Sequence, residues 1–406
     1  MPRFSACLLA LFILLCSPLL STWSHADQGF ASWVENFYQQ EARPVGISRQ
    51  TFDSVFSRVT APEPVVLKKA KYQPEFTTEI WDYLDMRLTP LAVSRGQKMA
   101  RKYSHTLQKI ETQFGVSRFV VLAIWSMESN YGAVLSNKSR LHYVPTALAT
   151  LAYQDKRRAR FARKQLIAVL QMVQAGEVQP QQLVGSWAGA MGHTQFIPSS
   201  YRAYAVSLDK RGGSDIWNSV PDALASAANL LHKNGWQTGR TWGYEVMSPG
   251  NGELYRDKSM ALGEWSQKGF RRSAHRQFPH LEERAFLKLP GGGNNPGFLV
   301  IKNFSVLKRY NNSDYYALAV GLLADRIAGF RGMQQKWILP LGALSLEERY
   351  ESQRLLRSHG YYAGTIDGNL GRGSRDAIRR FQQVRGLKDT GIANKDILTL
   401  LRKARK

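Results

Sequence analysis

Cysteine is nearly absent from this 406-residue chain, and its only two, Cys7 and Cys16, stand close to the N-terminus. A disulfide framework is therefore excluded for the rest of the chain. Beyond position 22 there is no uninterrupted run of the roughly 18 to 20 apolar residues that a membrane-spanning helix requires. Acidic side chains are few as well, 31 against 55 Lys and Arg, which gives a net charge of +24. With 44% hydrophobic residues the chain is nevertheless no disordered polycation, and its length predicts two or three folded domains.

Residues 1–26 are typical of a secretory signal peptide. A basic residue precedes a short apolar run, and Ser24 and Ala26 supply small residues at the −3 and −1 positions of a cleavage site. Pro18 interrupts the apolar run, which disfavours the alternative of an uncleaved anchor. A lipid on Cys16 is a second alternative, but Leu15 stands where a lipobox has a small residue. We therefore expect cleavage after Ala26 and a soluble exported protein.

The expected export narrows the set of partners that the positive charge could attract. Outside the cytoplasm nucleic acid is an improbable partner, whereas anionic polymers of the cell envelope would be concentrated by a field of this sign. A simpler interpretation, that the excess charge only gives solubility and weak adhesion, fits the composition equally well. Charge alone therefore identifies no ligand.

The pattern from residue 27 to about residue 337 is mostly helical. Apolar residues recur at three- and four-residue spacing in segments such as 161–173, 223–231 and 316–327. Between residues 242 and 304 two short β-like runs, 285–289 and 298–302, flank a turn rich in Gly, Asn and Pro, which predicts a β-hairpin. We therefore expect a mainly α (α+β) protein with a small β-containing insertion.

A second domain begins near the C-terminus. The helical pattern stops over residues 338–344, and Ser345 then stands three places before Glu348, the spacing of a capping box. These features predict a linker at 338–344 and a separate unit over 345–406. That unit is long enough for a compact bundle of three helices.

One carboxylate lies on the apolar side of a predicted helix. The segment 117–132 predicts an apolar helix that Ser117 caps and Gly132 ends. Counting back from Glu128 by three, four and seven residues reaches only apolar side chains: Trp125, Ile124 and Val121. Both desolvation and the helix dipole at this end favour the protonated form, as a general acid requires. A Glu that simply reaches solvent is the alternative, and periodicity does not separate the two.

Two further segments carry polar groups in a suggestive arrangement. Three glycines between Gly185 and Gly192 would let a ligand approach the backbone, and Ser186 and Gln195 offer hydrogen bonds to hydroxyl or amide groups. A tight turn in which Gln195 satisfies only backbone groups explains the same residues. From these residues alone we would favour the tight turn. Further on, Ser313 can cap a following helix.

These segments resemble the lytic murein transglycosylase B family. The resemblance runs in order from about residue 30 to residue 335, and the motif from Gly185 to Tyr201 is highly specific. The matching stretches are Glu128-Ser-Asn-Tyr-Gly132, Gly185-Ser-Trp-Ala-Gly-Ala-Met-Gly-His-Thr-Gln-Phe-Ile-Pro-Ser-Ser-Tyr201 and Arg309-Tyr-Asn-Asn-Ser313, with supporting matches at 73–76, 81–84 and 234–239.

The resemblance implies a lysozyme-like catalytic domain over residues 27–337, with Glu128 as the single catalytic acid. Glu128 would protonate the oxygen between N-acetylmuramic acid and N-acetylglucosamine and then act as base on the muramic 6-hydroxyl, so that a 1,6-anhydro ring closes without water. The implied substrate contacts are Ser186, Gln195, Tyr310, Asn311 and Tyr316. Tyr83 is a weaker candidate, since a core aromatic on a helix explains it equally well.

No cofactor and no metal site are expected. Some members of the family have a calcium loop shortly after the Pro-Ser-Ser-Tyr motif. The corresponding stretch here, 207–217, has Lys210 and Arg211 where acids would help, which leaves only Asp209 and Asp215.

The C-terminal unit resembles the small peptidoglycan-binding domain of many wall enzymes. The resemblance rests on Gly360-Tyr-Tyr-Ala-Gly-Thr-Ile-Asp-Gly-Asn-Leu-Gly371 and on the helix around Phe381. It implies that the unit tethers the enzyme to its polymer and raises the local substrate concentration. Physical reasoning alone identifies only a three-helix module.

The complete interpretation is a periplasmic, wall-associated lytic transglycosylase whose partner is the peptidoglycan glycan strand. Two alternatives remain at this point, a hydrolytic muramidase and a non-catalytic peptidoglycan-binding protein. A muramidase would need a second carboxylate near Glu128, and the three main motifs contain none. A nucleic-acid-binding protein would not need a signal peptide.

Overall fold

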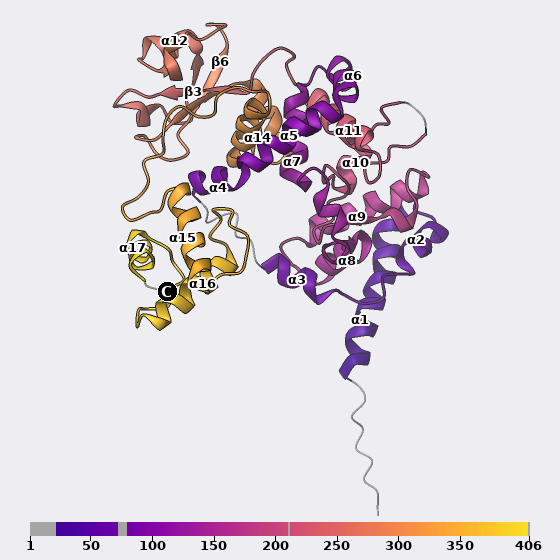
Figure 1. Cartoon of the computed structure of the whole chain (residues 1–406). Helices are drawn as coiled ribbons and strands as arrows, with labels where there is room; N and C mark the ends of the chain where they lie inside the picture. The colour runs from indigo at the N-terminus through magenta and orange to yellow at the C-terminus, as the bar shows by residue number, and fades with distance from the viewer. Residues whose placement is uncertain (1–21, 72–78, 210–211, 405–406) are drawn as a thin grey trace, which may run out of the picture.

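The computed structural model describes residues 22–71, 79–209 and 212–404. Most of the predicted signal peptide and the 73–76 motif therefore lie outside the described residues. Figure 1 shows two groups of helices, a sheet-containing insertion beside them and three C-terminal helices next to α4. None of the described helices is long and apolar enough to cross a membrane.

The first group of helices combines three from residues 22–71 with three from residues 144–204. Its large buried rings include Phe30, Phe37 and Phe52, which lie 0 to 1% exposed in the main core. The members are α1 (Thr22–Phe37), α2 (Arg49–Phe56), α3 (Pro64–Lys71), α8 (Val144–Gln154), α9 (Ala159–Gln174) and α10 (Pro198–Tyr204), with the short paired strands β1 (His142–Tyr143) and β2 (Val184–Gly185) beside them.

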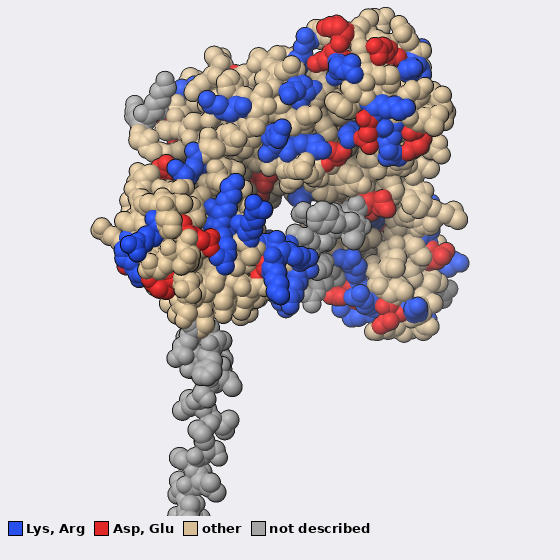
Figure 2. Space-filling model, turned by 180° about the vertical axis from the view of Figure 1, so that it is seen from behind, with Lys and Arg blue, Asp and Glu red and all other residues tan. Residues whose placement is uncertain are grey.

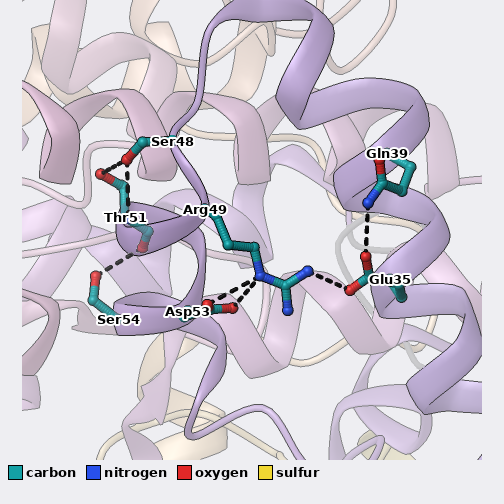
Figure 3. A network of polar contacts seen from close by, with 7 residues as sticks. All are labelled: Glu35, Gln39, Ser48, Arg49, Thr51, Asp53 and Ser54. Carbon is teal, nitrogen blue, oxygen red and sulfur yellow. Dashed lines mark hydrogen bonds and ion pairs between the residues drawn. The ribbon is translucent and has the colours of Figure 1, made fainter.

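A polar network joins α1 to α2 on the surface of this group (Figure 3). The Arg49 guanidinium donates to Glu35, with Nη1 and Oε2 2.7 Å apart, and to Asp53 of its own helix at 2.8 Å. It also lies 5.1 Å from the ring centroid of Tyr38. Solvent screens exposed ion pairs of this kind, so the packed rings beneath them supply most of the cohesion.

The second group surrounds one apolar helix, α7 (Arg118–Ser129). Residues 120–125 of α7 are all buried, and α14 (Asp314–Ile327), α5 (Pro90–Lys102), α6 (Ser104–Phe114) and α11 (Val220–Lys233) pack around it. The group is completed by α13 (Lys302–Tyr310) and by α4 (Ile80–Arg87), which packs on α14. Because residues 120–125 cover every side of the middle of α7 with apolar groups, polar side chains can reach solvent only at its two ends.

The insertion is an antiparallel sheet with its own small core. Its strand order is β4-β6-β7-β3-β5, and the buried rings of Trp265 and Phe270 fill the core beneath it. The elements are β3 (Gly243–Met247), β4 (Ser259–Ala261), α12 (Leu262–Gln267), β5 (Arg271–Arg272), β6 (Arg284–Lys288) and β7 (Gly297–Val300).

The C-terminal unit consists of α15 (Leu346–Ser358), α16 (Arg372–Val384) and α17 (Lys395–Lys403) around a separate core. The capping box predicted at its start is present. The Glu348 amide donates to the Ser345 hydroxyl at 3.2 Å, and the Ser345 amide donates to the Glu348 carboxylate at 2.7 Å.

The predicted fold class is confirmed, with three local differences. The β6–β7 hairpin exists, but it is the centre of a five-stranded sheet rather than an isolated pair. The second strand ends at Val300, and Lys302 already opens α13. Ser117 caps α7 as predicted, but the helix ends at Ser129 because Asn130 adopts the left-handed conformation two residues before Gly132.

The contact between α14 and the sheet contains a partly buried acid whose titration is testable. Burial raises the pKa of Asp325 to about 6, although the indole of Trp242 donates to its carboxylate at 3.1 Å and opposes the shift. The folded pKa of Asp325 exceeds its unfolded value. Its contribution to the stability of the folded protein is therefore fully present below about pH 4, where the carboxyl is protonated in both states, and is lost as pH rises through about 6.

We expect Asp325→Asn to unfold at a higher temperature than wild type at pH 7.5, by the equivalent of about 2–3 kcal/mol. The difference should vanish near pH 4, and thermal melts at both pH values measure it. Equal melting temperatures at pH 7.5 would contradict the prediction.

Candidate active site

Glu128 stands where α7 leaves the core. The residues that precede it by three, four and seven positions, Trp125, Ile124 and Val121, are at most 2% exposed, so the predicted apolar face is confirmed. Glu128 itself is partly exposed. The helix therefore delivers one carboxylate to the edge of an otherwise apolar region.

A buried tyrosine holds this carboxylate. The Tyr316 hydroxyl donates to Glu128 Oε1 at 2.6 Å, and the Tyr316 side chain is buried in the first turn of α14. The Ser313 hydroxyl accepts from the Tyr316 amide, so this helix begins as the sequence predicts. Burial, followed by the nearby Glu128 charge, raises the pKa of Tyr316 well above its usual value. Tyr316 therefore stays a neutral donor to the carboxylate.

Tyr310 lies parallel to Tyr316 and links it to the glycine-rich loop. The two ring centroids are 6.4 Å apart with an angle of 11° between the planes, and the Tyr310 hydroxyl donates to the Thr194 carbonyl at 2.6 Å. Burial is also the main cause that raises the pKa of Tyr310 well above its usual value. The pair of tyrosines thus connects α7, α14 and the loop at residues 192–195.

The glycine-rich stretch forms a compact turn. Ser186 Oγ accepts from the amides of Ala188 at 3.3 Å and Ala190 at 3.1 Å, and Gln195 Nε2 donates to the Gly192 carbonyl at 2.9 Å. Both candidate side chains thus bond the turn itself, as the simpler interpretation of the sequence has it. Their contact with substrate stays a prediction.

Gly192 is required at its position. Its φ is +68°, and a Cβ there would lie 2.4 Å from the Ile216 carbonyl oxygen. Gln195 also has a positive φ, 51°, which is uncommon for a residue other than glycine. Residues held in such conformations cluster at functional sites. The loop geometry therefore agrees with a site beside Gln195.

Two residues that the sequence analysis did not single out fasten this loop to α7. The Ser129 hydroxyl donates to the His193 carbonyl at 2.5 Å, and the Trp125 indole donates to His193 Nδ1 at 3.3 Å. Burial lowers the pKa of His193, which keeps the ring neutral and able to accept. Ser129 follows the catalytic candidate directly and His193 lies inside the long motif, but only the packed structure shows that they meet.

Tyr83 and Asn311 lie at the margins of the group. Tyr83 belongs to α4, its ring centroid lies 5.7 Å from that of Tyr315, and its hydroxyl helps to raise the pKa of Tyr316. Asn311 is exposed and ends α13. The structure therefore brings Glu128 together with Tyr316 and places Tyr83 on the neighbouring helix.

A sizeable cavity among the described residues lies elsewhere. It measures about 780 Å³ and is lined by residues from the sheet and from the C-terminal end of α14, including Tyr244, Arg272, Asp325 and Arg326. None of the predicted site residues lines it. We place the candidate site at Glu128, because the cavity lacks a residue of the three motifs.

Metal ligation finds no support in the part of the chain that the structure describes, which contains no group of three or more His, Cys, Asp or Glu that could hold an ion. Asp209 pairs with Lys109 at 2.6 Å. Asp215 Oδ1 accepts from the amides of Trp217 and Asn218. Lys210 and Arg211 lie outside the described residues, so the absence of calcium stays a prediction.

Comparison with known proteins agrees with this geometry. Residues 29–325 match the family described as Transglycosylase SLT domain, and residues 345–401 match the family described as Putative peptidoglycan binding domain. The chain is 28% identical over 295 residues to membrane-bound lytic murein transglycosylase B of Escherichia coli, which covers 72% of this chain and 79% of that protein.

Solved structures give the same result. SltB3 from Pseudomonas aeruginosa, in complex with NAG-NAM-pentapeptide, is 41% identical over 92% of this chain and 99% of that chain, with a TM-score of 0.71. SltB1 from the same organism is 29% identical over 73% of this chain and 98% of its own, with a TM-score of 0.64. The chain therefore belongs to the lytic transglycosylase family that includes SltB3 and lytic murein transglycosylase B, with an SLT domain followed by a peptidoglycan-binding domain.

Proposed function

We propose that Glu128 is the single acid and base with which this lytic transglycosylase cleaves the β-1,4 bond between N-acetylmuramic acid and N-acetylglucosamine. The observation that carries the proposal is the carboxylate at the end of buried α7, held by the Tyr316 hydroxyl at 2.6 Å. Structures of the SltB3 relative contain NAG-NAM-pentapeptide and NAG-anhNAM-pentapeptide, the second of which has the anhydro sugar that such a reaction makes.

The proposed reaction uses one carboxyl group twice. Protonated Glu128 gives its proton to the glycosidic oxygen as the bond from that oxygen to C1 of the muramic residue breaks. The resulting carboxylate then takes the proton of the muramic 6-hydroxyl, and O6 forms a bond to C1. The products are a 1,6-anhydro end and a free 4-hydroxyl, and Glu128 regains its proton without consumption of water.

Two side chains near Glu128 support its two roles. Tyr316 fixes the carboxylate by a hydrogen bond that is present in either protonation state of Glu128, because a phenol can donate to both. Tyr310 holds the Thr194 carbonyl and so keeps the loop at residues 192–195 in place. Burial raises the pKa of both phenols well above the usual value, which makes them too weak as acids to compete with Glu128.

The remaining candidates would hold the sugars. An aromatic face suits the apolar side of a pyranose ring, a role open to the partly exposed Tyr83 and Tyr310. The buried Tyr316 would meet the substrate only at its edge, beside Glu128. Gln195 and Asn311 carry amides that can pair with N-acetyl groups. Ser186 can bond a sugar hydroxyl once it exchanges one of its bonds to the turn.

The acid nearest to the third motif is unsuited to a hydrolytic mechanism. Asp314 pairs with Lys308 at 2.6 Å and with Lys288 at 3.0 Å. Burial alone would raise the pKa of Asp314, but these two lysines lower it below its usual value. Asp314 is thus occupied by two cations, which disfavours it as a base for water and favours the transglycosylase over a muramidase.

The protein is proposed to work in the periplasm on the glycan strands of peptidoglycan, with the unit 345–406 as the wall-binding domain and 338–344 as its linker. Cleavage of the signal peptide after Ala26 would deliver it there. The net charge of +24 favours an anionic polymer, and Figure 2 shows Lys and Arg side chains gathered near the centre of one face.

A mass measurement of the products tests the reaction class. We expect the purified protein to convert peptidoglycan into muropeptides that are one water lighter than those made by hydrolysis, because the muramic 6-hydroxyl replaces water as the nucleophile. Mass spectrometry of the digest distinguishes the two products. A hydrolytic muramidase as control gives the heavier species, and a predominance of reducing ends from this protein would replace the proposal with hydrolysis.

A further inference from the structure

The C-terminal unit is not merely tethered to the catalytic domain, because one of its arginines is buried against it. Arg349 of α15 is 8% exposed, and its guanidinium donates to the carboxylates of Asp82 and Asp85, both on α4. Arg349 Nε is also buried and has no hydrogen-bond partner among the described residues. Such a group is costly to bury unless the surrounding contacts are maintained. The two carboxylates of α4 therefore define where α15 sits.

The same short helix carries Tyr83 on another face. Asp82 and Asp85 stand three residues apart and share one face of α4, whereas Tyr83 and Arg87 stand four apart and share a different one. The Arg87 guanidinium lies 5.5 Å from the Tyr83 ring centroid. One face of α4 thus points to the C-terminal unit and another carries a candidate sugar-binding ring.

An eight-residue helix has little stability of its own, so its position depends on its contacts. Ile80, Trp81 and Leu84 pack into the main core. The Trp81 ring also lies 6.3 Å from that of Trp337, in the segment that leads to the C-terminal unit. Trp337 and the C-terminal unit thus add contacts to α4 beyond those it makes in the main core.

We propose that Arg349 is a positioning residue for glycan cleavage, which holds α4 and thereby Tyr83 in place beside Tyr315 and Tyr316. The inference rests on the proposed function of Glu128 and Tyr83. The contacts form a continuous path from Arg349 through α4 to Tyr83, from Tyr83 to α14, and from Tyr316 of α14 to Glu128. The wall-binding unit is in this sense part of the support of the active site.

The test uses the full-length protein and a soluble tetrasaccharide of alternating N-acetylglucosamine and N-acetylmuramic acid, for which wall tethering is irrelevant. We expect Arg349→Gln to lower kcat/KM about tenfold, because small misplacements of substrate-holding groups slow enzymes strongly. Arg349→Lys, which keeps the charge, should recover part of the loss. The matched control is Arg402→Gln, which breaks an exposed pair with Glu351 inside the same unit.

A double-mutant cycle separates positioning from a general loss of stability. Tyr83→Ala should lower kcat/KM by a similar factor, and Arg349→Gln added to Tyr83→Ala should cause little further loss, since both act through one ring. The double variant Asp82→Asn/Asp85→Asn breaks the same contact from the side of α4. It replaces Arg349→Gln as the test if Arg349→Gln folds poorly, and the same fall in kcat/KM is expected.

Three results would overturn the inference: wild-type kcat/KM in Arg349→Gln, an equal loss in Arg402→Gln, or full additivity with Tyr83→Ala. Glu128→Gln is assayed beside these variants, so that a failure of the inference about Arg349 can be distinguished from a failure of the proposed function. If Glu128→Gln is inactive while Arg349→Gln cleaves normally, only the role of Arg349 is rejected. If Glu128→Gln is active, the proposed function itself fails.

Discussion

Replacement of Glu128 by Gln is expected to abolish cleavage of peptidoglycan while wall binding is kept. The amide has the shape of the carboxylate and can still accept from the Tyr316 hydroxyl, but it can neither give a proton to the glycosidic oxygen nor take one from the 6-hydroxyl. General acid–base catalysis by one residue contributes about 10²- to 10⁴-fold, and Glu128 would serve both steps. We therefore expect a fall of at least about 10³-fold in the clearing rate of purified sacculi.

The control for this variant is Glu282→Gln, which removes an acid of the same type from a side chain that is 76% exposed in the insertion. It should clear sacculi at the wild-type rate. Binding is measured by pelleting with insoluble peptidoglycan, where Glu128→Gln and wild type should agree. Clearing by Glu128→Gln at the wild-type rate would refute the assignment of Glu128 as the catalytic acid.

Loss of the Tyr316 hydroxyl is expected to have the second-largest effect on the rate. Tyr316→Phe keeps the buried ring and its stacking on Tyr310 but removes the 2.6 Å bond to Glu128 Oε1. Hydrogen bonds to charged groups contribute about 1.5–3 kcal/mol, which corresponds to a fall of about 10- to 100-fold in kcat if the bond is needed throughout the reaction. KM should change much less, because the hydroxyl contacts the catalytic carboxylate.

Tyr143→Phe provides the control, since it removes a partly buried hydroxyl that donates from β1 to the Val55 carbonyl of α2 at 3.0 Å. Both variants lose one such bond, so a general loss of stability would slow them alike. Steady-state kinetics on the soluble tetrasaccharide compare them. If the two variants keep equal kcat values, the Tyr316 hydroxyl has no role in catalysis.

The insertion shows which features of the fold local sequence patterns can predict. The β-like runs predict the hairpin, because alternation and the Gly-rich turn act over a few residues. They do not predict that β3, β4 and β5 complete a five-stranded sheet, since β3 pairs with β7 across more than 50 residues of chain. Register between distant strands is set by packing that no short segment contains.

The sequence by itself determined the mainly helical character, several of the helices, the capping box at Ser345 and the apolar face that carries Glu128. It also determined the family, because the motifs are contiguous in the chain. All of these depend on residues a few positions apart, whose spacing fixes a helix face or a turn directly.

Only the tertiary structure decided how the site is assembled. Tyr316 meets Glu128 from 188 residues away, and Arg349 meets Asp82 from 267 residues away. The turn at Gln195 has a left-handed conformation that no propensity predicts for glutamine. The physical reason is that such contacts and conformations are stabilised by burial among many distant groups, and that burial exists only once the helices have packed.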